Sequence, residues 1–313
     1  MAGLTDDREK RLNELKKEVT ERGFDRHASA LKTVSELPFE LQSPTVTALA
    51  PRETLQTIIA FPPQIQRGWH YVPKQALLFT TTGLIHVSAS IWPGEEPQIT
   101  CLEGCSVLYV NITLILLYGA LEIVAQGQNV PTRLTLEFNT VDWYYLETPL
   151  RRFLQATALN SLADKESCSS VTRQTLSELP LKFLNGVRIH GLLPGEELKE
   201  LVFQPGTWKL WLYFFQQPAS ANKLLLLTSH YMVVIREEVD VKQGWIISYI
   251  PRDNITGIKN QPVSSWNELS VQLRRENQSV DYKLRLKDET AEVWRRQWVQ
   301  RGGSWEDLPE QQN

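Results

Sequence analysis

The stretch K-L-L-L-L-T-S-H-Y-M-V-V-I-R, residues 223–236, contains two apolar runs separated by Thr-Ser-His. Short apolar runs joined by turn-forming residues are typical of a β-hairpin. The same pattern occurs earlier, at 76–88, where A-L-L-F is followed by T-T-T-G and then by L-I-H-V-S. A hairpin that occurs twice in one chain indicates that the chain repeats itself.

Other blocks of sequence occur in the same order in the first and the second half of the chain. The paired blocks are 33–38 with 175–180, 49–55 with 192–198, 77–81 with 225–229, and 150–154 with 294–298. In the first pair, T-V-S-E-L-P matches T-L-S-E-L-P. Self-similarity at a nearly constant spacing is the signature of repeated structural units. We therefore predict a tandem duplication covering 33–157 and 175–302.

An uncharged run, C-S-V-L-Y-V-N-I-T-L-I-L-L-Y-G-A-L at 105–121, raises the question of a membrane span. It is shorter than the roughly 20 residues that a spanning helix needs. The corresponding part of the second repeat contains Arg252, Asp253 and Lys259, which no apolar span would carry. We therefore predict two buried strands, at 106–112 and 114–124, with Gly119 marking a bend.

Helices are predicted before and after the β regions. Leu12, Leu15 and Val19 lie at helical spacing, and a second short helix is predicted at 26–37, ending near Pro38. Thr148 is a candidate N-cap, with Pro149 at the first position of a closing helix. In the second repeat, Trp294 and Trp298 lie one turn apart and mark the matching helix.

The second repeat resembles a known fold family. Its hairpin at 223–236, the strand W-I-I-S-Y-I-P-R-D-N-I-T-G-I at 245–258 and a closing helix carrying Trp294 are similar to pleckstrin-homology-like (PH-like) domains of the bacterial PH-domain and GRAM type. The resemblance covers 190–302 directly and 46–157 through the repeat. It implies a mainly β protein with two partly open, seven-stranded barrels, each closed by a C-terminal helix.

This sequence also departs from the family pattern. Thr228 is followed by Ser-His-Tyr, without the usual arginine, and Glu103 replaces Pro251 in the first repeat. The hairpin region offers few basic residues, Lys209 and Lys223 in the second repeat, which is few for a polyphosphate ligand. The predicted domains are a helical N-terminal segment at 1–45, PH-like domains at 46–157 and 189–302, a helical linker at 158–188, and a flexible tail at 303–313.

Composition narrows the function classes. The chain has 313 residues, is 42% hydrophobic and 22% charged, and carries a formal charge of −3 with a pI near 6.0. Such a balance predicts a globular protein without general attraction to nucleic acid. The N-terminus is charged where a signal peptide would be apolar, so we predict a cytoplasmic protein. Cys101, Cys105 and Cys168 are predicted to be buried free cysteines rather than a metal site.

No catalytic pattern is present in the sequence. The five histidines are scattered, and none lies at a spacing from Cys, Asp or Glu that indicates a metal site or a triad. No phosphate-binding loop or dinucleotide fingerprint occurs. We therefore predict no catalytic residue, no metal and no cofactor. An enzyme with a site between the domains is the third alternative, after the two binding functions below.

Aromatic residues form one candidate binding surface. In a strand, the segment W-K-L-W-L-Y-F-F at 208–215 places three aromatic side chains on one face. These side chains are exposed to water unless another surface covers them. Covering by the first repeat or the linker is one interpretation, and a contact surface for a protein partner or a second copy is the other. The candidate partner-binding residues are Trp69, Tyr71, Trp211, Tyr213 and Phe215. The leading prediction is therefore a non-enzymatic interaction or scaffold protein that binds a protein partner.

Basic residues form a second candidate surface. Arg274, Arg275, Lys283, Arg285 and Lys287 form a stripe in the second domain. Such a run is often only a solvated face. The functional alternative is peripheral binding to anionic membrane lipid.

Overall fold

The structure is a computed structural model, and it describes most of the chain. The described residues are 2–21, 27–50, 53–66, 70–92, 94–159, 176–211, 215–238, 244–263, 266–276 and 278–309. Within these residues the protein is mainly β, with several antiparallel sheets, none of them closed into a barrel. No described helix has both the length and the apolar character needed to span a membrane.

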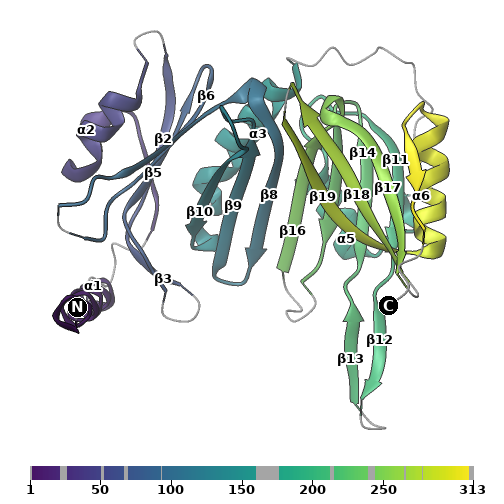
Figure 1. Ribbon diagram of the computed structural model, residues 1–313, viewed down its shortest axis with the longest axis horizontal. Coiled ribbons are helices and arrows are strands. Elements are labelled where there is room, and N and C mark those ends of the chain that lie inside the picture. The colour runs from purple at the N-terminus through teal and green to yellow at the C-terminus, as the bar shows by residue number, and fades with distance from the viewer. Residues whose placement is uncertain are drawn as a thin grey trace. The chain divides into compact units, whose positions relative to one another are not determined.

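The described residues of the first half contain three α-helices, three short η segments and ten strands (Figure 1). These are α1 (Ala2–Glu21), β1 (Ser29–Leu31), η1 (Val34–Glu36), α2 (Phe39–Ala48), β2 (Leu55–Phe61), β3 (Gln64–Gln66), β4 (His70–Val72), β5 (Gln75–Thr80), β6 (Gly83–Ser88), β7 (Gln98–Glu103), η3 (Gly104–Ser106), β8 (Val107–Ile115), β9 (Tyr118–Ala125), β10 (Thr132–Phe138), η4 (Thr140–Asp142) and α3 (Trp143–Leu159). The short η segments serve as turns between the larger elements.

The second half runs through the same kinds of element. These are α5 (Leu181–Gly186), η5 (Val187–Gly191), β11 (Leu198–Gln204), β12 (Thr207–Trp211), β13 (Phe215–Ser220), β14 (Lys223–Thr228), β15 (Tyr231–Arg236), β16 (Gly244–Pro251), η6 (Arg252–Asn254), β17 (Ile255–Val263), β18 (Trp266–Arg275), β19 (Gln278–Lys287), α6 (Asp288–Gln300) and β20 (Trp305–Asp307). From β2 to α3 and from β11 to α6 the strands follow one another in the same order.

The tight turns of the two hairpins have the same hydrogen bonds. Thr80 Oγ1 donates to the Gly83 carbonyl over 3.2 Å and accepts from the Gly83 N–H over 3.0 Å. Thr228 Oγ1 makes the same pair of bonds with Tyr231, at 3.1 and 3.0 Å. Since a threonine hydroxyl can replace backbone partners in a turn, the T-T and T-S sequences fix the same turn in both repeats.

By its backbone contacts the chain divides into two compact units that do not coincide with the repeats. Unit 1 is Met1–Cys105, Leu116–Ala120 and Leu134–Leu154, and unit 2 is Ser106–Ile115, Leu121–Arg133 and Gln155–Asn313. The predicted domain boundaries follow the duplication and remain predictions of where each repeat begins and ends.

Unit 1 is built on the sheet β1-β2-β5-β6-β7. Helix α2 packs on one face, where Leu41 joins Ile58, Leu78 and Ile85 in a buried cluster. Elsewhere in the unit, Phe61 contacts Phe138 and Phe79 contacts Phe153 through tilted or edge-on rings, a favourable geometry for aromatic pairs.

Unit 2 holds the larger core between two sheets. Its first sheet has the order β8-β16-β15-β14-β11, with Leu121–Ala125 of β9 beside β8, and its second has the order β19-β18-β17-β20. Apolar side chains from both sheets meet in one cluster, which Trp294 and Trp298 of α6 complete. Both tryptophans are buried, in the closing helix that their spacing predicts.

Strand β8 belongs to the first repeat but completes the core of unit 2. It pairs antiparallel with β16, from Gly244↔Ile115 to Tyr249↔Val110. The Asn254 amide donates to the Val107 carbonyl over 2.8 Å. Gln278 bonds both backbone groups of Gly127, at 3.0 and 2.9 Å. The second repeat therefore depends on the first for part of its sheet.

Two helix predictions were wrong. Residues 29–31 form β1 instead of the predicted helix at 26–37, and Pro38 begins α2 rather than ending a helix. Pro180 likewise begins α5. A proline without an N–H fits a helix start as well as a position after its end, and sequence alone did not separate these. Pro149 lies inside α3, which begins six residues earlier than predicted.

The apolar run at 105–121 does form two strands, β8 and β9, but the bend differs from the prediction. The chain turns at Leu116, whose φ is 48°, and Gly119 lies within β9. A Cβ at Gly119 would stand 2.4 Å from the Phe138 ring, so the glycine is needed for close packing rather than for the turn. Cys101 and Cys105 are exposed, contrary to prediction: Cys101 alternates with the buried Leu102 along β7, and Cys105 lies in the short η3 turn. Cys168 lies outside the described residues.

Candidate functional site

A row of polar side chains crosses the inner face of the first sheet of unit 2. Gln204 is paired with Lys223, and Lys223 is paired with Arg236, across β11, β14 and β15. Directly paired residues in an antiparallel sheet point to the same face. Two residues further along, Val202, Leu225 and Val234 form the next row and belong to the apolar core. Gln204, Lys223 and Arg236 therefore lie at the end of the core and face inward.

Two hydrogen-bond donors in this row, which we call the basic row (Gln204, Lys223 and Arg236), are buried without a partner. Gln204 is fully buried; its Oε1 accepts the Lys287 N–H over 2.8 Å, while Nε2 has no partner among the described residues. The Arg236 Nε is also buried without a partner there. A buried donor that bonds nothing costs about 1–3 kcal/mol. Such a cost is tolerated where a ligand supplies the acceptor.

Electrostatics in the basic row favour an anion. Lys223 donates to the Arg285 carbonyl and is directly opposite Arg236, a pairing of like charges that is unfavourable in a sheet. Burial, together with the charges of Arg236 and Arg285, lowers the pKa of Lys223 to about 8. An anion beside these groups would relieve both the repulsion and the unpaired donors.

The row lies at the base of a projecting β-ribbon. Strands β12 and β13 continue directly from β11 and β14 and extend beyond the sheet (Figure 1). Lys287 donates from Nζ to the Pro205 carbonyl over 3.2 Å at this base. The ligand would therefore enter the core of unit 2 from the ribbon end.

The structure separates the predicted basic stripe into two parts. Lys283 and Arg285 are exposed on β19 and share Glu268, at 3.0 and 3.3 Å, and Lys287 follows them towards the basic row. Arg274 and Arg275 lie at the far end of β18, four and five residues beyond Ser270, which pairs with Lys283. This is roughly 13–17 Å along the strand. There the Arg275 guanidinium donates to Asn254 Oδ1 over 3.2 Å, which gives Arg275 a structural role.

Sequence reasoning missed Gln204 and Arg236 as site residues. Lys223 begins and Arg236 ends the quoted hairpin, so the tight turn at Thr228 already implies that they are paired. The inward direction of Gln204 and its unpaired amide depend on the contact between β11 and β19, which no local pattern shows.

The predicted aromatic surface is mostly outside the described structure. Trp69 and Tyr213 lie outside the described residues, as do the side chains of Trp211 and Phe215. Tyr71 is buried in β4, and it lines a hollow of about 510 Å³ in unit 1 together with residues of α1. The aromatic surface remains a prediction.

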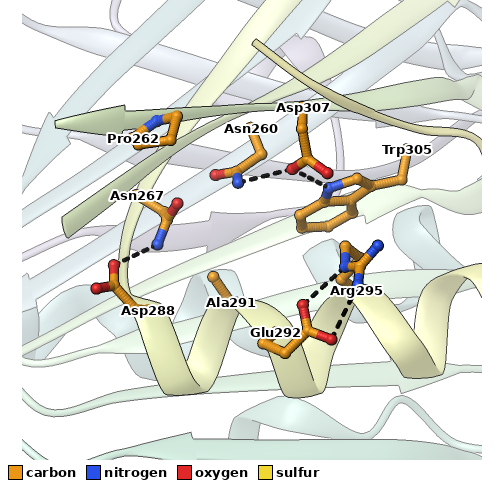
Figure 2. Close-up of a pocket in the computed structure, with 9 residues that line it drawn as sticks. All are labelled: Asn260, Pro262, Asn267, Asp288, Ala291, Glu292, Arg295, Trp305 and Asp307. Carbon is orange, nitrogen blue, oxygen red and sulfur yellow. Dashed lines mark hydrogen bonds and ion pairs between the residues drawn. The ribbon is translucent and has the colours of Figure 1, made fainter. Parts of the chain in front are cut away.

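A second hollow lies beside α6 in unit 2. It has a volume of about 460 Å³, and Figure 2 shows Trp305 between the strand residues Asn260 and Asp307 and the helix residues Glu292 and Arg295. Glu292 accepts two hydrogen bonds from Arg295, at 2.7 and 2.9 Å. We call this hollow the α6 groove.

Two histidines, His230 and His86, are held by contacts within the fold. His230 Nδ1 lies 2.5 Å from Glu196 Oε1, and Glu196 Oε2 accepts the backbone N–H of His230. At the matching hairpin of the first repeat, the Thr82 hydroxyl donates to Glu53. His86 is buried against Gln75 at 2.8 Å, and burial lowers its pKa to about 4. Among the described residues, no group of three His, Cys, Asp or Glu side chains is placed to hold a metal.

Comparisons with known proteins add little. No family model matches the sequence, and no curated protein matches it. Among solved structures, the chain is similar to the hSac2 domain from human phosphoinositide phosphatase Sac2, with 15% identity over 46% of this chain and 93% of that chain. The TM-score of 0.27 is too low to support an argument about fold or function.

Proposed function

We propose that the protein is a non-enzymatic interaction module built from two PH-like repeats, and that the second repeat binds phosphate groups at an anionic membrane surface. The matching order of elements and the identical threonine turns support the duplication. The resemblance of 190–302 to PH-like domains supports the fold of each repeat.

One observation carries the ligand proposal: the basic row holds buried donors that have no partner in the described part of the chain, next to two like charges. A phosphate group offers acceptor oxygens for the Gln204 amide and the Arg236 Nε–H, and negative charge for the Lys223 ammonium. Lys283, Arg285 and Lys287 lie on the strand that borders the row, where they would attract an anionic surface before contact. Membrane lipids present such phosphates at high density.

Vesicle co-sedimentation tests this proposal. The full chain should bind vesicles of phosphatidylcholine with phosphatidic acid and should not bind phosphatidylcholine alone. Arg236→Met should weaken binding at least tenfold, because the phosphate loses a charged donor. Lys283→Met is the matched control: it removes one positive charge outside the row and should weaken binding less than threefold.

Two results would contradict the proposal. Equal loss of binding in both variants would show that only general charge matters. Inorganic phosphate that binds at the row, without any binding to anionic vesicles, would place the ligand in solution rather than in a membrane.

Binding of a protein partner, the leading prediction from the sequence, stays a proposal. It would use a different part of unit 2, where the edge of β17 meets the α6 groove.

A further inference from the structure

The outer edge of β17 accepts an added strand, and the chain itself supplies one. β20 lies parallel to β17, with Ile258↔Trp305, Lys259↔Glu306 and Asn260↔Asp307. The Ile258 N–H donates to the Ser304 carbonyl over 3.0 Å, and the Leu308 N–H donates to the Asn260 carbonyl over 2.7 Å. Main-chain bonds of this kind depend little on side chains, so another extended segment could make them.

The side chains of β20 show what this edge selects. Trp305 packs against the core of unit 2. Its indole N–H and the Asn260 amide both donate to Asp307 Oδ1, over 3.0 and 2.9 Å (Figure 2). These two bonds lower the pKa of Asp307, and the charge of Arg295 lowers it further. An aromatic residue followed two positions later by a carboxylate therefore fits the groove.

Charge complementarity extends to the neighbouring position. Glu306 lies 3.6 Å from Lys259 on β17. The acidic residues of β20 thus face a lysine from β17 and an arginine from α6.

The internal strand fills only part of the available space. The α6 groove continues past Asp307 along Pro262, Asn267 and Asp288. Asn260 Oδ1 is buried in this wall and has no hydrogen-bond partner among the described residues. A longer segment could fill the remaining volume and donate to this oxygen, which gives it an advantage over β20.

A glycine pair allows β20 to reach the edge. Gly302 has a φ of 76°, and a Cβ at Gly303 would stand 2.2 Å from the Trp298 ring. The chain therefore reverses immediately after α6. Such a short tether keeps a weak segment at an effective concentration of roughly millimolar, so an outside segment binds only by displacing it.

We infer that the edge of β17 and the α6 groove form a docking site for an extended segment of a partner protein, one that carries an aromatic residue followed two positions later by a carboxylate. β20 is the chain's own occupant of this site. The inference is independent of the basic row, which lies in other strands.

A competition experiment with the full chain tests the inference. The probe is a fluorescein-labelled peptide with the chain's own sequence R-G-G-S-W-E-D-L, residues 301–308. Trp305→Ala should release β20, so that fluorescence anisotropy shows at least tenfold tighter peptide binding than to the wild-type chain. A peptide with alanine in place of its aspartate should bind at least tenfold more weakly.

A change in the groove provides the second arm. Asn260→Ala, added to Trp305→Ala, should reduce peptide affinity about tenfold because the peptide carboxylate loses its amide donor. Should Trp305→Ala disturb folding, Asp307→Ala replaces it, because Asp307 is exposed and its loss removes both side-chain bonds that hold β20 on the edge.

Three results would overturn the inference. One is a folded Trp305→Ala chain that does not bind the peptide. Another is peptide binding that Asn260→Ala leaves unchanged. The third is a wild-type dimer at the assay concentration that Trp305→Ala abolishes, which would assign the edge to a second copy of this chain.

Discussion

Replacing Lys223 with methionine should stabilise the protein at neutral pH. The pKa of Lys223 falls from 10.5 to about 8 on folding, and each unit corresponds to about 1.36 kcal/mol. The charged lysine therefore destabilises the folded state by about 3 kcal/mol below pH 8. Methionine removes this penalty but also the bond to the Arg285 carbonyl, which contributes about 1 kcal/mol. We expect a net gain of about 2 kcal/mol at pH 7.

The gain should disappear as the pH rises, which identifies its cause. Between pH 8 and 10.5 the unfolded lysine holds its proton while the folded one releases it, so wild-type stability increases through this window. At the upper end the methionine variant should be no more stable than the wild type. Comparing the two chains cancels the titration of the buried tyrosines, which both share.

Urea unfolding followed by circular dichroism at pH 7 and 10.5 measures this difference. Lys283→Met is the control, because that lysine is 67% exposed and its replacement should change stability by less than 0.5 kcal/mol. A Lys223→Met gain that is the same at both pH values would refute the electrostatic explanation. A loss of stability at pH 7 would refute the claim that the charge of Lys223 destabilises the folded protein when no ligand is bound.

Other regions give independent predictions. Trp294→Ala should lower the free energy of unfolding by about 3–5 kcal/mol, since the side chain is 1% exposed in the core of unit 2; a calorimetric loss below 1 kcal/mol would argue against this packing. Gln278→Ala leaves both backbone groups of Gly127 unpaired and should cost about 2 kcal/mol, measured by urea unfolding. Native-state labelling mapped by mass spectrometry should modify Cys105 faster than Cys101, because partial burial and Glu53 raise the pKa of the Cys101 thiol; the reverse order would contradict this effect on Cys101.

Local patterns predict the hairpins well and the assembly of the sheets poorly. The T-T and T-S turns, with apolar runs on either side, determine both hairpins and therefore the pairing of Lys223 with Arg236. The closing tryptophans of α6 follow from helical spacing. These features depend on residues close in sequence, so alternation and turn chemistry are enough to identify them.

Long-range pairing accounts for what the sequence did not show. β8 is apolar along most of its length, and nothing in it distinguishes β16 as its neighbour from a strand of its own repeat. The tail at 303–313, predicted to be flexible, contains β20 because three residues find a free edge on β17. The unpaired amide of Gln204 likewise depends on the position of β19.

The pKa of Lys223, followed by NMR of its side chain, tests the central claim that the basic row binds phosphate. In the free protein the pKa should be about 8. Saturating dihexanoyl phosphatidic acid should raise it by at least one unit, because the phosphate stabilises the charged lysine, while dihexanoyl phosphatidylcholine should leave it unchanged. A free-protein pKa near 10.5, or no response to phosphatidic acid, would contradict the account.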